Sequence, residues 1–528
     1  MVKIVLTADR AVFTDFNGVD ALGFGLCLPY RLVPWIIEYL VLAPKISVKD
    51  GVRARIAPYP LAKIEAALLA TGFKHDDVAI VPPEKIHKVI DRDTAIVGIH
   101  VLDPRGLSPV SWTLQVMTGG GKSCTAYEFE KLIRRVQKLK AVYRFKVVVG
   151  GPGVWQLRGF ERVLGIDVLF DGEAEITFPS IAKKILNGEE VPSYVVGEQP
   201  SIEMIPPIIT PSRNGLVEIT RGCPRRCQFC SPTMRYFRSI PLETIIKEID
   251  VNLRNGIKIV SFITEDVLLY GSQNLKINED AIKRLYIEAL SKSKAYGVSQ
   301  IGFTHVSCAS AYSAPHLVKF ISDVNGFDAD NPIFPQVGLE SGSVRIVEKF
   351  FRGKTYPYPP EKWPEIVVSS AKLFNDNYWY PCFTYIVGFP GEEVEDHIKT
   401  LELLDTLESE GFKGWTFPLF LIPMGDTLIE NKASFKYLKD LSKEAVDTIV
   451  KGWKMSLRFS REIYRKLIRV RNPIAMRIVN AFAELAFKAM EQWIEGLSKD
   501  PEKALVEYSK VEIRGLRQLV GAVIRMLF

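Results

Sequence analysis

Three of the seven cysteines in this 528-residue chain fall within eight residues, and this group constrains the fold and the chemistry more than any other feature. Cys223, Cys227 and Cys230 are spaced C-x3-C-x2-C. The apolar run 216–220 precedes them and predicts a strand, so the thiols lie on a loop that leaves a strand end, where functional residues gather. Thiolates this close together can hold one iron–sulfur cluster. A cluster that usually takes four ligands would keep one iron open to bind a substrate.

Other uses of closely spaced cysteines fit the pattern less well. Disulfides would leave one thiol unpaired, and the chain shows no secretory context. A structural zinc site needs a fourth Cys or His nearby, and none lies between Ser231 and His305. Inert, buried cysteines are not expected among Arg and Pro residues in a loop. We therefore interpret Cys223, Cys227 and Cys230 as cluster ligands.

Short apolar segments alternate with helical patterns over residues 1–200. Strands are expected near 3–7, 78–81, 95–102, 145–149 and 168–170, with amphipathic helices near 60–71 and 126–140. This alternation predicts an α/β domain with a doubly wound, Rossmann-like parallel sheet, which binds ligands at the carboxyl ends of its strands. Gly150 and Gly151 follow one of these strands and would let a bulky ligand approach the backbone. An ordinary tight turn explains the pair equally well.

Residues 205–430 repeat the strand–helix alternation six times, which predicts a (β/α)6 partial TIM barrel with its site on the rim of strand ends. Carboxylates on such a rim suit an ammonium group or ribose hydroxyls, and glycine lets backbone pack against a flat ring. Taken singly, each carboxylate would be an ordinary solvated surface residue. The rim residues of interest are Glu265, Asp266, Glu340, Ser341, Gly388 and Glu392.

The cysteine motif, with Phe229 before its third Cys and the rim residues following in order, resembles the radical S-adenosylmethionine (radical SAM) enzymes. The resemblance implies that the three cysteines bind a 4Fe-4S cluster whose open iron holds S-adenosylmethionine. It also implies that an electron from the cluster cleaves this cofactor to a 5′-deoxyadenosyl radical. The resemblance assigns seven residues to S-adenosylmethionine. Glu265 and Asp266 would meet its amino group, Glu340 and Ser341 its ribose and carboxylate, and Gly388 and Glu392 its adenine, while Phe229 lies within the cysteine motif itself.

Residues 1–200 resemble the cobalamin (B12)-binding domain that precedes many radical SAM domains, because Gly150-Gly151-Pro152 is followed by Asp171-Gly172-Glu173-Ala174-Glu175. This resemblance implies cobalamin contacts by Gly150, Gly151 and Asp103. The loop at Asp103 lacks the histidine that ligates cobalt from below in methionine-synthase-like domains. A non-His residue or water from the loop 103–109 would then face the cobalt. The alternative is a degenerate domain that keeps only the fold.

The basic character of the chain belongs to its C-terminal region, residues 431–528. The net charge is +7, and the segment 451–528 alone holds sixteen Lys and Arg against eight Asp and Glu. Helices are expected over 442–470, 473–496 and 501–528, and an apolar surface is expected from Phe482, Leu485, Phe487, Met490, Trp493 and Ile494. This region is a helical cap on the barrel, a surface that docks on anionic lipid, or a lid over an elongated substrate.

The chain shows no apolar run long enough to span a membrane and no signal peptide, so a cytoplasmic protein is predicted, with peripheral membrane contact through the C-terminal helices as a further expectation. A reductant protein of the ferredoxin or flavodoxin type is the expected partner. Nucleic acid is not expected. No RNA-binding module is visible, and the N-terminal half lacks the extra cysteines of the tRNA methylthiotransferases.

These observations predict a radical SAM enzyme that, with cobalamin, modifies an unactivated carbon by C-methylation or C–C bond formation. The resemblance includes a methyltransferase branch and an archaeal lipid-modifying, tetraether ring synthase-like branch, so a lipid is one candidate substrate. The first alternative is a cobalamin-independent radical SAM cyclase or mutase with a vestigial first domain. The second, a non-enzymatic cofactor carrier, would have no use for the full set of rim residues.

Overall fold

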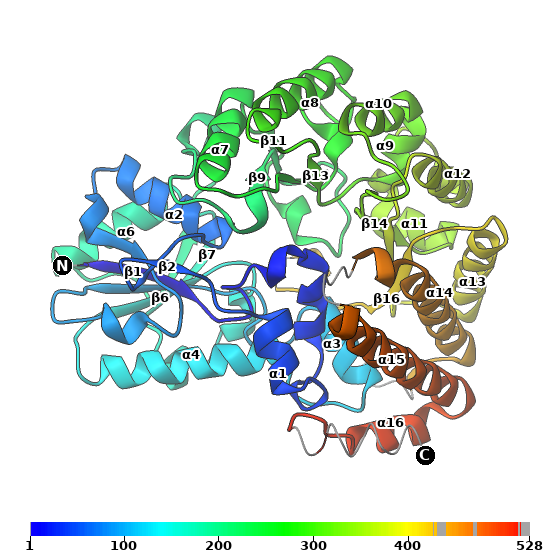
Figure 1. The fold of residues 1–528 in the computed structure, drawn as a ribbon, viewed down its shortest axis with the longest axis horizontal. Coiled ribbons are helices and arrows are strands. Elements are labelled where there is room, and N and C mark those ends of the chain that lie inside the picture. Colours follow the sequence, from blue (N-terminus) through cyan, green and yellow to red (C-terminus); the bar gives the residue numbers. More distant parts are fainter. Residues whose placement is uncertain (1, 426, 430–439, 468–472, 516–517, 519–528) are drawn as a thin grey trace.

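Two parallel arrays of strands organise the chain, one in the first 200 residues and one in the middle of the sequence (Figure 1). The computed structural model describes residues 2–425, 427–429, 440–467, 473–515 and 518. Among the described helices, none has the length and apolar character needed to cross a bilayer.

The first array is a six-stranded sheet in the order β4-β1-β5-β6-β7-β8, and every neighbouring pair is parallel. Strand order reverses between β1 and β5, which is the switch point where doubly wound sheets bind ligands. Alternate residues of β1 point to opposite faces, because Ile4 and Leu6 join one apolar core and Val5 joins the other. The predicted doubly wound fold is therefore confirmed. The strands are β1 (Ile4–Ala8), β4 (Val78–Ile80), β5 (Ile96–His100), β6 (Lys146–Gly150), β7 (Val168–Gly172) and β8 (Tyr194–Gly197).

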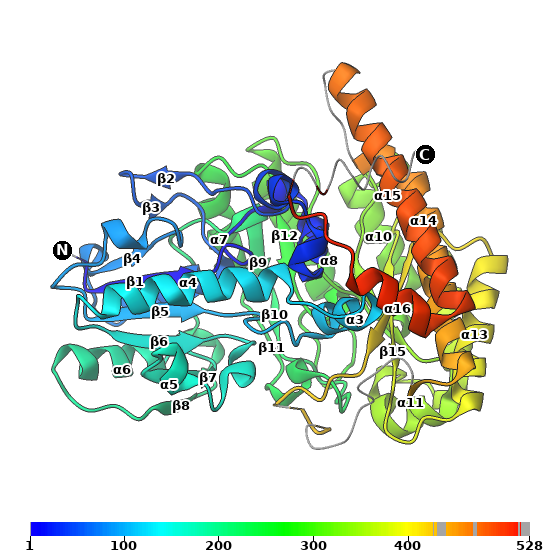
Figure 2. The ribbon, with the colours of Figure 1, turned by 90° about the horizontal axis from the view of Figure 1, so that it is seen from below.

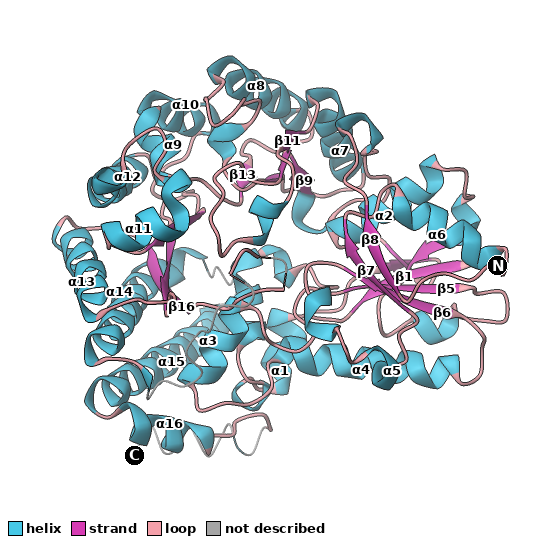
Figure 3. Ribbon diagram, turned by 180° about the vertical axis from the view of Figure 1, so that it is seen from behind, coloured by secondary structure: helices cyan, strands magenta, loops and turns pink. Residues whose placement is uncertain are grey.

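Helices cover both faces of this sheet (Figure 3). Helices α2 (Tyr59–Ala70) and α6 (Thr177–Leu186) pack on the face that carries Ile4 and Leu6. The opposite face packs against α4 (Cys124–Lys140), which Ser123 caps by accepting a hydrogen bond from Ala126 N, and α5 (Glu161–Leu164) lies nearby. The segment between β1 and α2 contains α1 (Trp35–Ile37) and the short antiparallel pair β2 (Val48–Lys49) and β3 (Arg53–Ala54).

The second array contains six parallel strands in two groups of three. An isolated parallel bridge between His305 and Gln336 joins the groups, so the strands follow one another around a partial barrel, as predicted. Strands and helices alternate along the chain, and the helices cover the outside. The strands are β9 (Leu216–Glu218), β12 (Ser261–Ile263), β13 (Gly302–Phe303), β14 (Gln336–Glu340), β15 (Cys382–Val387) and β16 (Trp415–Phe420). The helices are α7 (Leu242–Arg254), α8 (Glu279–Lys294), α9 (Cys308–Ser313), α10 (Pro315–Asn325), α11 (Val344–Phe351), α12 (Trp363–Asp376) and α13 (Val394–Ser409).

Segments from the first 200 residues pack on β16, the last strand of the barrel. Helix α3 (Pro109–Met117), inserted between β5 and α4, packs along β16, and Phe420 N donates a hydrogen bond to Thr113 Oγ1 at 2.9 Å. The ring of Phe24 stacks on Phe417 of the same strand, with centroids 6.0 Å apart. The barrel core and the N-terminal domain are thus joined by direct packing.

The C-terminal region forms three successive helices (Figure 2), the first of which packs on β16 and α13, the second on the first, and the third on the second. Phe487, Trp493 and Ile494 are buried, and Trp493 Nε1 donates to the carbonyl of Met117 at 3.0 Å. The described part of this region therefore has the packing expected of a helical cap on the barrel. The helices are α14 (Lys443–Leu467), α15 (Pro473–Lys499) and α16 (Pro501–Ser509).

The predicted helix over 501–528 is wrong at residues 510–515, because the helix that begins at Pro501 ends at Ser509. Residues 510–515 instead run beside the N-terminal segment, where Ile513 N donates to Arg31 O at 2.9 Å and Arg514 pairs with the fully buried Glu38. Those contacts replace the helical hydrogen bonds that the apolar pattern predicted. Most of the apolar stretch 516–528 lies outside the described residues, and lipid contact by the tail stays a prediction.

Candidate functional site

The three cysteines lie on a loop closed by two short antiparallel strands. Strands β10 (Thr220–Arg221) and β11 (Arg238–Ser239) pair Thr220 with Ser239 and Arg221 with Arg238, so residues 222–237 form a closed loop at the end of β9. Within it, Cys227 is buried, and Cys223 and Cys230 are half-buried. In the described part of the chain, no three His, Cys, Asp or Glu side chains converge closely enough to hold a single metal ion.

Burial raises the pKa of all three cysteine thiols, and raises that of Cys227 to about 12. The neighbouring carboxylate Glu265 raises the pKa of Cys223 and Cys230 further. Thiols in this environment hold their protons until a metal replaces them, because the bond to the metal offsets the cost of forming the buried thiolate. The same three thiols are therefore suited to a cluster and poorly suited to reacting as free nucleophiles.

Glu265 and Asp266 are neighbours in sequence but have different environments. Asp266 is buried, and its Oδ2 accepts hydrogen bonds from Arg225 Nη2 at 2.9 Å and from Ser310 Oγ at 2.6 Å. It therefore ties the cysteine loop to the barrel. Glu265 is half-buried and makes no hydrogen bond to another described side chain. Of the two, Glu265 is the carboxylate that is open to a ligand.

Glu340 and Ser341 also differ. Glu340 ends β14 in a left-handed conformation (φ 63°) and forms an ion pair with the largely buried Lys354. Burial would lower the pKa of Lys354, but the charge and the hydrogen bond of Glu340 raise it, so the ammonium persists next to the cysteines. Ser341 is fully buried, and its hydroxyl is shared between Thr400 and the amide of Ser343. Lys354 was not predicted from the sequence.

The segment after β15 contacts the cysteine loop through aromatic rings. Phe229 packs edge-to-face on Phe389, with centroids 5.7 Å apart, and on Phe351. Gly388 has φ 99°, which favours glycine. The Glu392 carboxylate accepts hydrogen bonds from the amides of Gly388 at 2.6 Å and Phe389 at 3.0 Å. Burial raises the pKa of Glu392 to about 7 despite these bonds. Through the two hydrogen bonds, Glu392 shapes the turn that holds Phe389 on Phe229.

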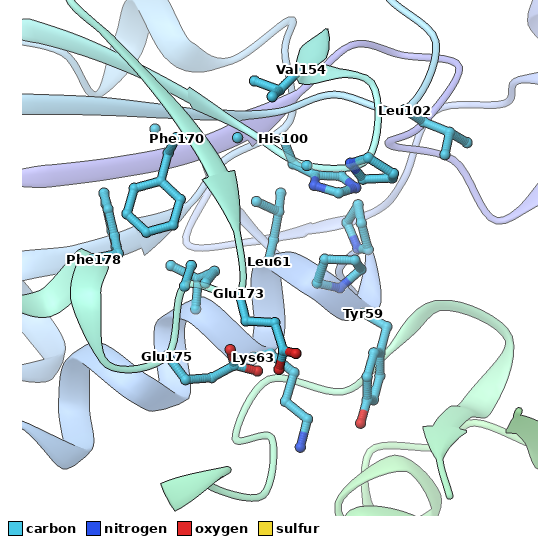
Figure 4. A pocket seen from close by; sticks show the side chains of 18 of the residues that line it. Tyr59, Leu61, Lys63, His100, Leu102, Val154, Phe170, Glu173, Glu175 and Phe178 are labelled. Atoms are coloured by element: carbon cyan, nitrogen blue, oxygen red, sulfur yellow. The ribbon is translucent and has the colours of Figure 1, made fainter. Parts of the chain in front are cut away.

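A cavity of about 430 Å³ lies between the N-terminal sheet and the barrel (Figure 4). Its walls include the carboxyl ends of β5, β6 and β7 as well as Leu216 and Ile263 of the barrel. Phe170 and Phe178 line one part, and Glu173 and Glu175 point away from them (Figure 4). The cavity can therefore receive a large ligand that has both apolar and polar parts.

Gly150 and Gly151 line this cavity, as their place at a strand end predicts, but Asp103 does not. At Gly151 (φ 118°), a Cβ atom would lie 2.5 Å from Val101 O and 2.6 Å from His100 Nδ1. Asp103 is buried in its own loop, where it accepts hydrogen bonds from Ser108 N at 2.9 Å and Gln156 Nε2 at 3.0 Å. Asp103 therefore shapes the loop, and Leu102 reaches the cavity instead.

His100 also lines the cavity and was missed in the sequence. Burial and the nearby Arg213 lower its pKa to about 4, so the imidazole is neutral at pH 7 and keeps a free lone pair for a metal or a hydrogen-bond donor. His100 is the last residue of β5, and the other candidate residues were chosen because they follow strand ends, so the same criterion could have identified it.

The fold and the cysteine loop together define a class: a partial β/α barrel with a three-thiol loop on its rim, preceded by a doubly wound sheet. Residues 217–404 match the model of the radical SAM superfamily, and this range begins in β9 and ends in α13. The central part of the chain therefore carries a radical SAM domain.

Curated relatives match part of the chain. The chain is 27% identical over 220 residues to the ribosomal protein uS12 methylthiotransferase RimO of Xanthomonas axonopodis, with 39% of this chain and 44% of the relative covered. It is 26% identical over 288 residues to the tRNA-2-methylthio-N(6)-dimethylallyladenosine synthase of Thermotoga petrophila, with 52% and 59% covered. This chain thus spans less than two thirds of the length of these relatives.

The arrangement of both domains is similar to solved structures of TsrM, a radical S-adenosylmethionine methyltransferase from Kitasatospora setae. One holds tryptophan and an S-adenosylmethionine analogue, and another holds cobalamin and a 4Fe-4S cluster. The TM-score to the first is 0.51 at 15% identity, and 85% of this chain and 83% of TsrM are covered. At this identity the likeness establishes a shared fold.

The contrast between Glu265 and Asp266 leads to a stability prediction. Asp266→Asn removes the charge that faces the buried Arg225 and should destabilise the cluster-free protein by about 3 kcal/mol. Glu265→Gln breaks no described hydrogen bond and should change stability by less than about 0.5 kcal/mol. Thermal unfolding followed by circular dichroism compares the two, and equal midpoints would contradict the structural role of Asp266.

Proposed function

We propose that this protein is an enzyme that cleaves S-adenosylmethionine reductively at a cluster held by Cys223, Cys227 and Cys230. The observation that carries the proposal is the set of three loop thiols next to an open carboxylate, Glu265. Three ligands leave one iron of a 4Fe-4S cluster free for the amino and carboxylate groups of S-adenosylmethionine. When bound and reduced, such a cluster supplies the electron that breaks a carbon–sulfur bond of S-adenosylmethionine, which yields a 5′-deoxyadenosyl radical.

The side chains around the thiols have separate tasks in this proposal. Glu265 accepts a hydrogen bond from an N–H of the methionine amino group, because Glu265 has no partner among the described side chains. Lys354 keeps a positive charge beside the thiolates and the Glu340 carboxylate. The packing of Phe229 on Phe389 excludes water from one side of the cluster loop.

We further propose that the cavity between the domains binds cobalamin. Its volume accommodates part of a corrinoid, its lining combines apolar walls with charged groups, and Gly150 and Gly151 bring backbone without side chains to its wall. The shared fold with TsrM, which holds cobalamin, supports the assignment. Bound cobalamin would supply a methyl carrier, so the reaction is C-methylation or C–C bond formation at an unactivated carbon. His100 is the imidazole available to contact it.

The cysteine inventory favours this reaction over methylthiolation. In the first 200 residues, the cysteines are Cys27 and Cys124, and burial raises the pKa of both thiols, that of Cys27 to about 12. Two thiols provide too few ligands for a second iron–sulfur cluster held by cysteines alone. A cobalamin-independent cyclase or mutase remains the second candidate, and the corrinoid measurement below separates it from the first.

An electron must also reach the cluster, and we propose that a low-potential, acidic carrier protein of the ferredoxin or flavodoxin type delivers it. Arg226, directly before Cys227, is exposed with φ 56°, and Arg352 is exposed in a segment that packs on the cysteine loop. The contact between these segments includes the hydrogen bond from Gln228 N to Phe350 O at 2.9 Å. Exposed cations beside a redox centre attract an acidic partner.

Cys227→Ala should abolish both the cluster absorbance and the formation of 5′-deoxyadenosine. The thiol is buried at the centre of the motif, and two cysteines cannot replace three. Anaerobic reconstitution, followed by visible spectroscopy and chromatography of the products, measures both. Cys382→Ala, in a half-buried thiol on β15, is the control and should keep both. Deoxyadenosine at the original rate in Cys227→Ala would overturn the proposed activity.

Gly151→Ala should lower the affinity for cobalamin about tenfold or more, because a Cβ atom there collides with Val101 O and His100. Gly159→Ala is the matched control, since Gly159 also has a positive φ (83°) but nothing lies within 4 Å of its Cβ position. Equilibrium titration followed by the corrinoid spectrum gives both affinities. Equal affinities, or no binding by the unmodified protein, would favour the cobalamin-independent alternative.

The double substitution Arg226→Glu and Arg352→Glu should slow cluster reduction by an acidic flavodoxin about tenfold at low salt, with a smaller effect at high salt. Reduction by dithionite should not change. The control reverses Arg254 and Arg284, which are 68% and 72% exposed on α7 and α8. Stopped-flow absorbance gives the rates. Equal slowing in both double variants would exclude this docking surface.

A further inference from the structure

A buried network of charges joins the cavity wall to both ends of the cysteine loop. Glu173 and Glu175 follow β7 and line the cavity. Arg221 Nη1 lies 2.6 Å from Glu173 Oε2 and 2.7 Å from Glu175 Oε1, and Arg221 Nη2 lies 2.7 Å from Glu218 Oε2. The other oxygen of Glu173 pairs with Arg238 Nη2 at 2.5 Å. Three carboxylates therefore enclose two guanidinium groups.

The network is shielded from solvent, so its geometry is strongly fixed. The side chains of Glu173, Arg221 and Arg238 are 4%, 9% and 6% exposed. Burial alone would raise the pKa of Glu218, but the charge and hydrogen bonds of Arg221 hold it below its ordinary value. Removing one member of such a network leaves a buried charge without its partner, and the remaining groups must move to find another.

The two arginines occupy equivalent places on the two strands that close the cysteine loop. Arg221 and Arg238 are register partners across β10 and β11, and the loop consists of the residues between them. The neck of the loop is narrow at Gly222 (φ 78°), where a Cβ atom would lie 2.7 Å from the carbonyl oxygens of Arg235 and Tyr236. A displacement of Arg221 and Arg238 would therefore move the whole cysteine loop together with the two strands that close it.

We propose that Glu173 and Glu175 are positioning residues that act through Arg221 and Arg238 to set the place of the cysteine loop relative to the cavity. This inference rests on the proposed function, because it gives the acidic segment after β7 a task at the cluster. The carboxylates act by holding the arginines. The distance between the two cofactor sites is thus fixed by carboxylates of the cavity wall that hold the arginines at the base of the cysteine loop.

A second buried ion pair at the same boundary provides a matched control. Lys63 of α2 lies 2.5 Å from Glu248 of α7, and Tyr59 donates a hydrogen bond to the same carboxylate at 2.8 Å. This pair also joins the N-terminal domain to the barrel and is as deeply buried. It is attached to two helices and forms no hydrogen bond or ion pair with Arg221 or Arg238 in the described structure. Tyr59 Oη also accepts a hydrogen bond from Glu218 N at 3.2 Å.

The experiment compares Glu173→Gln with Glu248→Gln in the full-length, anaerobically reconstituted protein. Each substitution keeps the side-chain shape and removes one buried charge. Three readouts are compared: the thermal midpoint, the electron paramagnetic resonance spectrum of the reduced cluster with and without cob(II)alamin, and the rate of 5′-deoxyadenosine formation. Arg238→Lys, which keeps the charge but loses the two-pronged geometry, replaces Glu173→Gln if that variant does not fold.

We expect both variants to lose thermal stability and only Glu173→Gln to change the cluster. Its spectrum should shift, the magnetic coupling to cob(II)alamin should change, and deoxyadenosine formation should fall about tenfold or more, because small displacements of reacting groups cost rate. Identical cluster readouts in the two variants would overturn the positioning role. A wild-type protein without a cluster or deoxyadenosine would instead overturn the proposed function. The cluster spectrum and the rate decide the inference even if no corrinoid binds.

Discussion

Parallel strands present all their carboxyl ends at one edge, and this protein brings two such edges to the same cavity. The walls combine the ends of β5, β6 and β7 with Glu218 and Ile263, the last residues of the barrel strands β9 and β12. Backbone polar groups, loops and ligands gather at these edges because the strand interiors are filled by apolar side chains. A ligand in the cavity and a cluster on the loop after β9 would therefore be neighbours as a consequence of topology.

Two edges of this kind cannot be joined by apolar packing alone, since both carry polar groups. The boundary is held by buried ion pairs between the domains: Lys63 with Glu248, and Arg221 and Arg238 with Glu173. Such pairs contribute little net stability compared with an apolar contact of the same size, but they impose direction. Apolar joints are used elsewhere, where α3 and Phe24 pack on β16. The buried ion pairs thus lie where the position of the N-terminal domain relative to the cysteine loop affects the proposed chemistry.

The sequence predicted the residue types of the site better than their individual tasks. The C-x3-C-x2-C spacing and the strand–helix alternation are local signals, so the cysteine loop and both parallel folds could be predicted. Whether a strand-end carboxylate is open or engaged depends on residues far away in sequence. Asp266 is engaged by Arg225 and Ser310, and Glu392 by the turn that it closes. Lys354 lies fourteen residues beyond Glu340, after a helix, so no periodicity could have linked them.

The left-handed backbone conformation of Glu340 destabilises the fold at a position next to the cysteine loop. A left-handed backbone at a residue that is not glycine carries strain, and such strain persists only where surrounding contacts enforce it. Here the register between β14 and β15 shifts between Gly338 and Glu340, and the carboxylate folds back toward Lys354. At Gly338, a Cβ atom would overlap both Glu340 Oε1 and Lys354 Nζ, so the ion pair occupies the space that a side chain at this position would take. A buried ion pair, a bulge and a strained residue together cost stability. They concentrate next to Cys227, which supports the view that Glu340 and Lys354 are held for a ligand and not for the barrel itself.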